Sequence, residues 1–398
     1  MQKKLCAADF QRDVNPIAQH YSQFQADKRL LLTGHSHQAW PDIALDGVKE
    51  TWNDAATHLD DKWQFAFEKA RLVEQGFARL LNDSEGSYAL AENTHTLVVR
   101  FLSALDLRKR PRLITSDSEF HSIRRQLDRL SEEGIEVMRV ASQPHGTFAE
   151  RLASQVNEKT AAVLVSSVFY NSGQICNGLN EVMTACNRQG TALLVDTYHH
   201  LNVVPFDITS EGLQQAYMVG GGYKYCQLGE GNCFLRIPPA CQLRPVITGW
   251  YADFESLGNS TGHQVNYGDG GQRFAGATYD PTSHYRAAKV FDFFTENELD
   301  PLLLREINQH QTTLLLSRFD ALDLPADFIG RDHTVSQPLR GGFIALKSPH
   351  ATTLTSALHA QQFYCDSRGG IMRLGPAPYL SDRQLHNAMD IFSTVAKE

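Results

Sequence analysis

VDTYHHLNVVPFD (residues 195–207) and GGGYKYCQLGEGNCF (residues 220–234) are the two stretches of this sequence that decide its fold. The first ends an apolar run with an aspartate, Asp196, and the second places Lys224 among five glycines and two tyrosines. Glycines permit tight turns and let a ligand approach the backbone closely. We therefore expect Lys224 to lie in a tight turn and not on the face of a helix.

Asp196 and Lys224 have both an ordinary and a chemical interpretation. An aspartate at a strand end is usually a turn or cap residue, and a lone lysine is usually a solvated surface group. Enzymes that use pyridoxal 5′-phosphate (PLP) need both groups. A carboxylate keeps the pyridine nitrogen protonated, and an amine forms a Schiff base and later moves protons. The pair therefore predicts PLP as cofactor, held by Lys224.

The composition argues against several other classes of protein. The chain has 398 residues, 42% hydrophobic content and a net charge of −8, without the basic stripe that nucleic acid or an anionic membrane would require. The N-terminus lacks an apolar run, and no segment has bilayer length. The seven cysteines form no CxxC pair, and the 16 histidines form no HExxH motif. We expect a cytoplasmic protein with reduced thiols, no metal and no nucleic-acid or membrane partner.

Apolar runs alternate with amphipathic stretches of helical period from Tyr88 onward, which predicts a mainly parallel sheet with helices on both faces. We expect an α/β fold in three parts: an N-terminal arm and helical segment (1–85, part of the small domain), a large PLP-binding domain (86–285) and a small C-terminal α+β domain (286–398). The predicted strands are Tyr88–Ala91, Arg112–Thr115, Glu136–Val140, Ala161–Ser166 and Ala192–Asp196.

Several polar or aromatic residues follow or end these apolar runs. Ligands of such sheets gather at the carboxyl ends of the strands, so these residues are expected to form one site. Asn93 and Thr94 precede a helix whose free N–H groups and dipole suit a phosphate, although Thr94 could serve only as a helix cap. The residues are Asn93, Thr94, Phe120, Ser166, Asp196 and Lys224.

The order of motifs resembles the fold-type I PLP enzymes of the class V aminotransferase group, and among them kynureninase most. The resemblance covers nearly the whole chain. The motifs that carry it are LLTGHSHQAWP (31–41), VSSVFYNSGQI (165–175), DTYHHLNVVPFD (196–207), GYKYCQLGEG (222–231), GW (249–250) and IMRLGPAPY (371–379).

This resemblance implies roles for individual cofactor residues. Lys224 would carry the Schiff base, Asp196 would pair with the pyridinium, and His199 would lie near the cofactor. Phe120 would stack on the ring, unless it only packs in the core. Further cofactor contacts are implied for Ser122, Ser166, Tyr223, Trp250 and Thr278, the last from the neighbouring subunit of a homodimer. The family's aspartate in this turn is replaced here by Ile123.

The resemblance to the family is looser at the residues that would contact the substrate. Arg373 would grip the α-carboxylate, because a guanidinium offers it two parallel donors, whereas we interpret Arg368 as structural. His35, Ser36 and His58 would contact the rest of the substrate.

The implied reaction is kynureninase-like hydrolysis of the Cβ–Cγ bond of kynurenine or 3-hydroxykynurenine, giving alanine and an anthranilate. Alternatives are a class V aminotransferase, a cysteine desulfurase or β-lyase, and a non-catalytic PLP-binding homologue. A desulfurase needs a cysteine on a mobile loop to take up sulfur. Cys365 lies where such a loop could be, but as a lone thiol it is better interpreted as buried.

Overall fold

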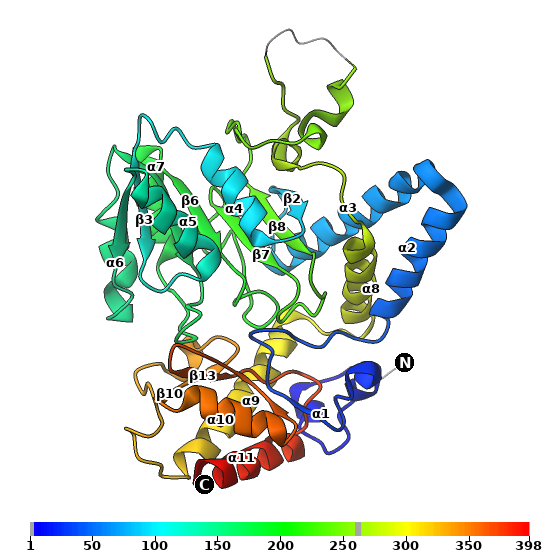
Figure 1. Ribbon diagram of the computed structural model, residues 1–398, viewed down its shortest axis with the longest axis vertical. Coiled ribbons are helices and arrows are strands. Elements are labelled where there is room, and N and C mark those ends of the chain that lie inside the picture. Colours follow the sequence, from blue (N-terminus) through cyan, green and yellow to red (C-terminus); the bar gives the residue numbers. More distant parts are fainter. Residues whose placement is uncertain (1–3, 259–263, 398) are drawn as a thin grey trace.

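The computed structural model describes residues 4–258 and 264–397, and its centre is a seven-stranded sheet (Figure 1). Strand β8 runs opposite to the other six strands, which all point in the same direction. The predicted mainly parallel sheet is confirmed. In spatial order the strands are β2 (Ser87–Ala91), β8 (Cys233–Ile237), β7 (Tyr217–Gly221), β6 (Ala192–Asp196), β5 (Thr160–Ser166), β3 (Arg112–Ser116) and β4 (Glu136–Val140).

Helices cover both faces of this sheet, because successive side chains of a strand point to opposite faces. In β5, Val163 and Val165 belong to the core that α6 and α7 cover, whereas Ala162 and Leu164 belong to the core beneath α4 and α5. This is why the central strands β5 and β6 are mostly apolar. The helices are α4 (Thr94–Ser103), α5 (His121–Glu132), α6 (Phe148–Ala153) and α7 (Leu179–Gln189).

A second, smaller unit follows the central sheet in the chain. It contains a four-stranded antiparallel sheet in the order β12-β13-β10-β9, packed with three helices. Its elements are α9 (Pro301–Asp320), β9 (Gly330–Arg331), β10 (Ile344–Lys347), α10 (Ala351–Ala360), β11 (Phe363–Tyr364), β12 (Asp366–Arg368), β13 (Ile371–Leu374) and α11 (Asp382–Lys397).

The N-terminal segment contacts both units. α1 (Ala7–Phe10) packs on α9, and β1 (Leu30–Leu31) pairs in parallel with β11. The helical hairpin of α2 (Ala44–His58) and α3 (Lys62–Leu81) packs instead on α8 (Thr282–Glu296), and α3 also contacts β2 (Figure 1). The predicted grouping of residues 1–85 with the small domain thus describes the arm better than it describes the hairpin. Within residues 4–258 and 264–397, no helix is both long and apolar enough to cross a membrane.

Arg236 in β8 forms a buried ion pair that fixes the edge of the central sheet. Its side chain is 0% exposed and that of Asp83 2% exposed, with Nε donating to Asp83 Oδ2 at 2.8 Å. Its Nη1 donates to the carbonyls of Gln214 and Ala216 at 2.7 and 2.8 Å. Its Nη2 donates to Asp83 Oδ1 at 3.2 Å, so that each of the three guanidinium nitrogens has a partner.

Replacement of Arg236 by methionine is expected to lower the free energy of unfolding by about 3–5 kcal/mol, because Asp83 would remain buried without its partner. Urea denaturation followed by circular dichroism would measure the change. The control is Arg318→Met, which removes an exposed ion pair to Asp390 and should cost below about 1 kcal/mol. Equal losses for the two variants would contradict the prediction.

Candidate active site

The carboxyl ends of β2, β5, β6 and β7 open onto one cavity of about 200 Å³. Such strand ends are where ligands of α/β sheets bind. The predicted cofactor residues, apart from Trp250 and Thr278, line this cavity. Its lining comprises Glu92, Asn93, Thr94, His95, Phe120, Ser122, Ser166, Tyr170, Asp196, Tyr198, His199, Tyr223, Lys224, Glu230, Gly231 and Cys233.

Lys224 lies in the turn after β7, and its side chain reaches into the cavity. The turn is tight: a Cβ on Gly222 would stand 2.6 Å from Leu228 Cβ, which explains why glycine is needed there. Lys224 is 4% exposed, and its Nζ lies 2.8 Å from His199 Nε2. The same nitrogen lies 4.6 Å from the ring centre of Tyr198 and 5.3 Å from that of Phe120. The amine thus lies among aromatic rings and beside the His199 imidazole.

Burial lowers the pKa of Lys224 to about 7. The negative charge of Asp196 opposes this shift, and the positive charge of Arg373 adds to it. Removing an ammonium group from water disfavours its charged form. Near neutral pH a large part of Lys224 is therefore the neutral amine, which is the nucleophilic and proton-accepting form.

The rate at which PLP combines with the apoprotein should consequently rise about tenfold per pH unit below pH 7 and level off above it. Stopped-flow absorbance in the visible band of the bound cofactor would measure this rate. The control is PLP with Nα-acetyl-lysine, whose one amine is the side-chain group with a pKa of about 10.4. A plateau reached only near that higher pH would contradict the lowered pKa.

Asp196 is the last residue of β6, and His199 lies in the turn that follows it. Asp196 is 6% exposed and accepts a hydrogen bond from the Tyr198 N–H at 2.9 Å; its burial raises the pKa of the carboxyl group. Burial also lowers the pKa of His199 well below its ordinary value, and the Lys224 charge adds to this. His199 Nδ1 is buried and has no hydrogen-bond partner among the described residues. The imidazole is therefore neutral, with one ring nitrogen left for a ligand.

A second buried carboxyl group of the site, Glu119, was missed by the sequence analysis. It is 1% exposed and accepts hydrogen bonds from Ser116 Oγ at 2.5 Å, from Ser166 Oγ at 2.5 Å and from the Ser166 N–H at 3.2 Å. Burial raises the pKa of Glu119 to about 7. Glu119 thus orients Ser166, whose register partner in the sheet is Asp196. Its position one residue before Phe120 is the signal that could have identified it.

The N-terminus of α4 forms another wall of the cavity. Asn93 is the cap residue, since its Oδ1 accepts the Thr96 N–H at 2.9 Å, and Thr94 is 6% exposed beside it. Ser122 lies in the first turn of α5 and also lines the cavity. Ile123, which replaces the family aspartate, is fully buried in the core under α4 and α5. An apolar side chain there contributes to packing instead of to the polar lining.

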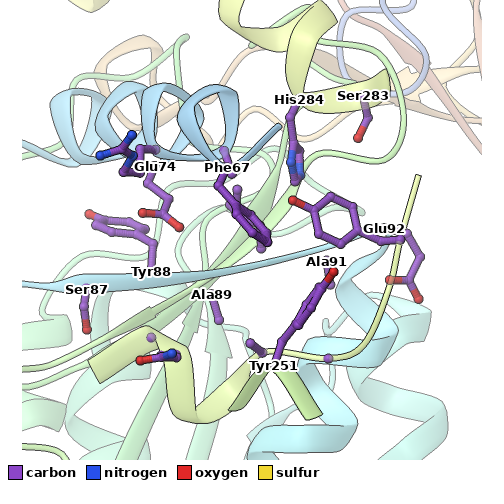
Figure 2. A pocket seen from close by; sticks show the side chains of 18 of the residues that line it. Phe67, Glu74, Ser87, Tyr88, Ala89, Ala91, Glu92, Tyr251, Ser283 and His284 are labelled. Atoms are coloured by element: carbon purple, nitrogen blue, oxygen red, sulfur yellow. The ribbon is translucent and has the colours of Figure 1, made fainter. Parts of the chain in front are cut away.

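Thr278 lines a different and larger cavity of about 1470 Å³, next to the first (Figure 2). Tyr251, Phe67 and His284 point into it, while Glu92 and Glu230 line both cavities. Trp250 lies beside this region, 44% exposed, with its ring 4.2 Å from that of Tyr251. Within this single chain, neither Trp250 nor Thr278 joins the cavity around Lys224.

Among the predicted substrate residues, His35 and Ser36 lie near Arg373, whereas His58 packs elsewhere. His58 stacks on Phe65 at the end of α2, and Ser36 Oγ donates to the Thr33 carbonyl at 3.2 Å. His35 is fully buried, and its Nε2 lies 2.6 Å from Asp366 Oδ1. None of these three lines the cavity.

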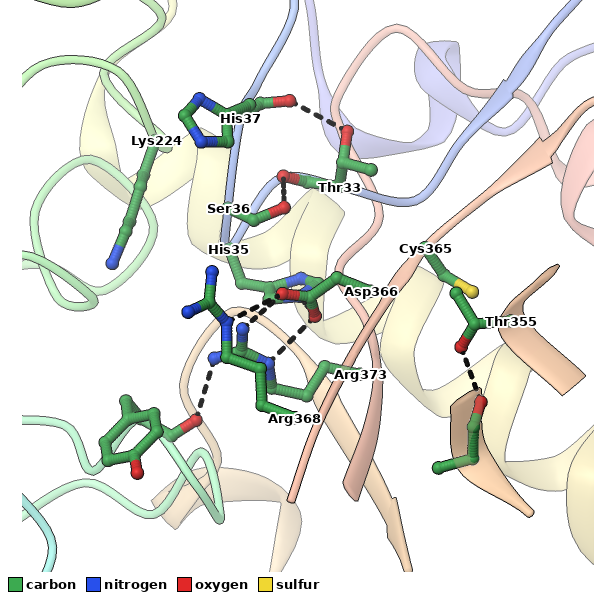
Figure 3. Close-up of polar contacts among 12 residues, drawn as sticks. Thr33, His35, Ser36, His37, Lys224, Thr355, Cys365, Asp366, Arg368 and Arg373 are labelled. Atoms are coloured by element: carbon green, nitrogen blue, oxygen red, sulfur yellow. Dashed lines mark hydrogen bonds and ion pairs between the residues drawn. The ribbon is translucent and has the colours of Figure 1, made fainter. Parts of the chain in front are cut away.

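Arg373 is 3% exposed and already holds a carboxylate of its own chain, as Figure 3 shows. Its Nε donates to Asp366 Oδ1 at 2.9 Å, its Nη2 pairs with Asp366 Oδ2, and its Nη1 donates to the Tyr170 carbonyl at 3.0 Å. Asp366 was the second residue that sequence reasoning missed. Among the described residues, no cluster of three or more His, Cys, Asp or Glu side chains could hold a metal ion.

The profile of the family described as aminotransferase class-V matches residues 91–316. The chain belongs to this family. Among curated relatives, the uncharacterized aminotransferase YcbU of Bacillus subtilis is 21% identical over 343 residues, covering 86% of this chain and 88% of that protein. The cysteine desulfurase IscS of Rickettsia akari is 24% identical over 192 residues, 46% of each chain.

Solved structures with the same fold agree with this class-V assignment. A mutant of C-DES with glycine covalently linked to its PLP cofactor has a TM-score of 0.82 at 16% identity, covering 95% of this chain and 99% of that one. A cysteine desulfurase from Thermococcus onnurineus has a TM-score of 0.78 at 12% identity, with both chains fully covered. The fold is therefore that of the fold-type I PLP enzymes.

The protein is a PLP-dependent class-V enzyme, and the residues of the cavity fit this cofactor. PLP presents an aldehyde, a ring nitrogen, a phenolic oxygen and a phosphate. The cavity offers a largely neutral amine, a buried carboxylate, an unpartnered imidazole nitrogen and a helix N-terminus. Predicted PLP binding is confirmed, whereas none of the relatives named above is a kynureninase.

Proposed function

We propose that Lys224 holds PLP covalently and is the base that removes the α-proton of an amino-acid substrate. The buried amine with a pKa near 7 supports this role, because a neutral amine can accept a proton at physiological pH. Bound PLP supplies an electron sink. Asp196 keeps the pyridine nitrogen protonated, and His199 orients the Lys224 amine through the 2.8 Å contact.

We assign the other cavity residues to holding the cofactor. Phe120 stacks against the ring, while Asn93, Thr94 and Ser122 bind the phosphate at two helix N-termini. Ser166, oriented by Glu119, and Tyr223 complete the polar contacts. Trp250 and Thr278 would reach the phosphate from a second copy of the chain in a homodimer. The neighbouring cavity and the exposed rings of Trp52, Trp250 and Phe254 support that assembly.

For the reaction, we propose cleavage of a Cβ–S bond by β-elimination, in which the sulfur leaves with a small molecule. The related cysteine desulfurases and a solved structure described as a cystine C–S lyase support sulfur chemistry. Cys365, the cysteine predicted as a possible sulfur acceptor, is 2% exposed, and burial raises the pKa of its thiol to about 12. Such a thiol is unsuited to accept sulfur. Release of the sulfur as a free product therefore fits this chain better than its transfer to Cys365.

The proposed reaction balances without any further oxidant. Lys224 takes the α-proton, the Cβ–S bond breaks, and the sulfur leaves with both electrons as a thiolate or persulfide. Water then hydrolyses the C=N bond of the remaining three-carbon fragment, which releases the nitrogen as ammonia. The net reaction converts an S-substituted cysteine and water into pyruvate, ammonia and the thiol or persulfide. The protein contributes the base, the ring-nitrogen partner and the exclusion of bulk water.

The test is to give the holoenzyme L-cystine and, separately, L-kynurenine or an amino acid with a keto acid. We expect pyruvate and persulfide from cystine. Transamination is the second candidate, because the relative that aligns with 86% of the chain is named an uncharacterized aminotransferase. Transamination would convert the cofactor to its amine form. Formation of anthranilate from kynurenine would confirm that the protein is a kynureninase, as the sequence predicted. Either of the last two outcomes without pyruvate would refute the lyase proposal.

A further inference from the structure

We propose that Glu119 is a positioning residue which decides, by holding or releasing one proton, whether Ser166 donates or accepts a hydrogen bond in the cofactor cavity. The inference rests on PLP binding and on the contact between Ser166 and the cofactor that the proposed function includes. It is independent of the reaction that follows.

Hydrogen bonds determine which oxygen of Glu119 can carry a proton. Oε1 accepts from the Ser116 hydroxyl at 2.5 Å and from the Ser166 N–H at 3.2 Å. The Ser116 oxygen itself accepts from the Ser118 N–H at 3.0 Å, and its own proton is directed to Glu119. Both acceptor sites of Oε1 are thereby used. A proton on Glu119 must therefore be carried by Oε2.

The partner of Oε2 is the Ser166 hydroxyl, whose Oγ lies 2.5 Å away. A hydroxyl group has one proton and two acceptor sites. When Glu119 is ionised, the Ser166 proton points to Oε2, and only acceptor sites remain for the cavity that Ser166 lines. When Glu119 is protonated, Oε2 donates to Ser166 Oγ, and the Ser166 proton can point into the cavity. Uptake of one proton thus reverses the hydrogen bond that Ser166 offers to a ligand.

The surroundings of Glu119 allow both protonation states near neutral pH. Burial raises the pKa of Glu119 to about 7, the hydrogen bonds from Ser116 and Ser166 oppose this shift, and the charge of Asp196 adds to it. Asp196 acts from the neighbouring strand, where it is the register partner of Ser166. Burial, and then the Glu119 charge, raise the pKa of the Cys176 thiol, which is therefore neutral. Asp196 is thus the charged group whose state acts on Glu119.

The chemistry of the ligand determines which of the two states is favoured. An anionic oxygen, such as the phenolic oxygen of PLP at neutral pH, needs a hydrogen-bond donor. Ser166 can donate to it only while Glu119 is protonated. We therefore expect bound PLP to raise the pKa of Glu119 by about one to two units, the size expected for a hydrogen bond to a charged group.

The experiment follows the infrared C=O band of protonated carboxyl groups against pH, in the apoprotein and in the PLP-loaded protein. Isotope-labelled glutamate separates this band from those of the cofactor, and the component lost in Glu119→Gln belongs to Glu119. Its midpoint is expected near pH 7 without PLP. With PLP it should lie about one to two pH units higher. Ser166→Ala should remove most of this rise, because the hydroxyl that connects Glu119 to the cavity is lost.

Glu74→Gln provides the matched control. Burial also raises the pKa of Glu74 to about 7, but this side chain lines the larger cavity. The component lost in Glu74→Gln should therefore not move when PLP binds. Glu119→Gln should still bind PLP, because its amide nitrogen can donate to Ser166 Oγ as the protonated acid does.

Three results would overturn the proposal: a wild-type midpoint that PLP leaves unchanged, an equal rise in Ser166→Ala, or a carboxyl band that Glu119→Gln does not reduce. The visible band of the cofactor reports attachment to Lys224 in the same samples. If that band is present while the Glu119 midpoint does not move, the inference about Glu119 fails and the proposed role of Lys224 stands.

Discussion

Replacement of Lys224 by alanine is expected to abolish the covalent attachment of PLP and to lower turnover of any amino-acid substrate by about 10³-fold or more. The variant loses both the amine that holds the cofactor and the base that removes the α-proton. Folding should be preserved, because the change removes a buried amine whose desolvation already disfavours its charged form.

Borohydride reduction followed by peptide mass spectrometry would measure attachment, and product formation from cystine would measure turnover. The control is Lys109→Ala, which removes an exposed lysine whose side chain is 84% exposed. That variant should retain the cofactor and full activity. A reduced pyridoxyl group found on a lysine of the Lys224→Ala protein would show that the wrong amine has been assigned.

Replacement of Asp196 by asparagine is expected to lower turnover by about 10²- to 10³-fold while PLP remains attached to Lys224. Asparagine keeps the shape and can still accept the Tyr198 N–H, but it carries no charge to hold the pyridine nitrogen protonated. The free energy of unfolding should not fall, because burial already raises the pKa of Asp196 and disfavours its charge.

Activity and the pH dependence of the cofactor spectrum would be measured together for this variant. Asp46→Asn, at a side chain that is 56% exposed, is the matched control and should behave as wild type does. If Asp196→Asn kept wild-type turnover, the carboxylate would not be the partner of the ring nitrogen. Loss of PLP without any change in its spectrum would instead indicate a role in binding.

The sequence predicted the central sheet and most of its site because both follow local rules. Alternating strands and helices require a parallel sheet, and the residues after its strands must meet at one edge. Asp196, Phe120 and Lys224 illustrate this, since each follows a different strand and all three line one cavity.

What the sequence did not predict are contacts between distant parts of the chain. His35 and Tyr170 meet Asp366 and Arg373 across more than 200 residues, and no periodicity in the sequence reports such a meeting. The motif containing Arg373 was visible, but the carboxylate that occupies its guanidinium was not. Glu119 was missed for a related reason: its partner Ser166 lies on another strand. Which carboxylate pairs with a given arginine is a property of the folded molecule.

The pairing of β1 with β11 has a consequence for how the protein is made. Leu30 and Leu31 leave the ribosome more than 300 residues before their partners Phe363 and Tyr364. The arm must therefore remain undocked while the central sheet of the nascent chain is already assembling. Its apolar residues are open to chaperones during that interval, and the arm can dock only after Tyr364 has been synthesised.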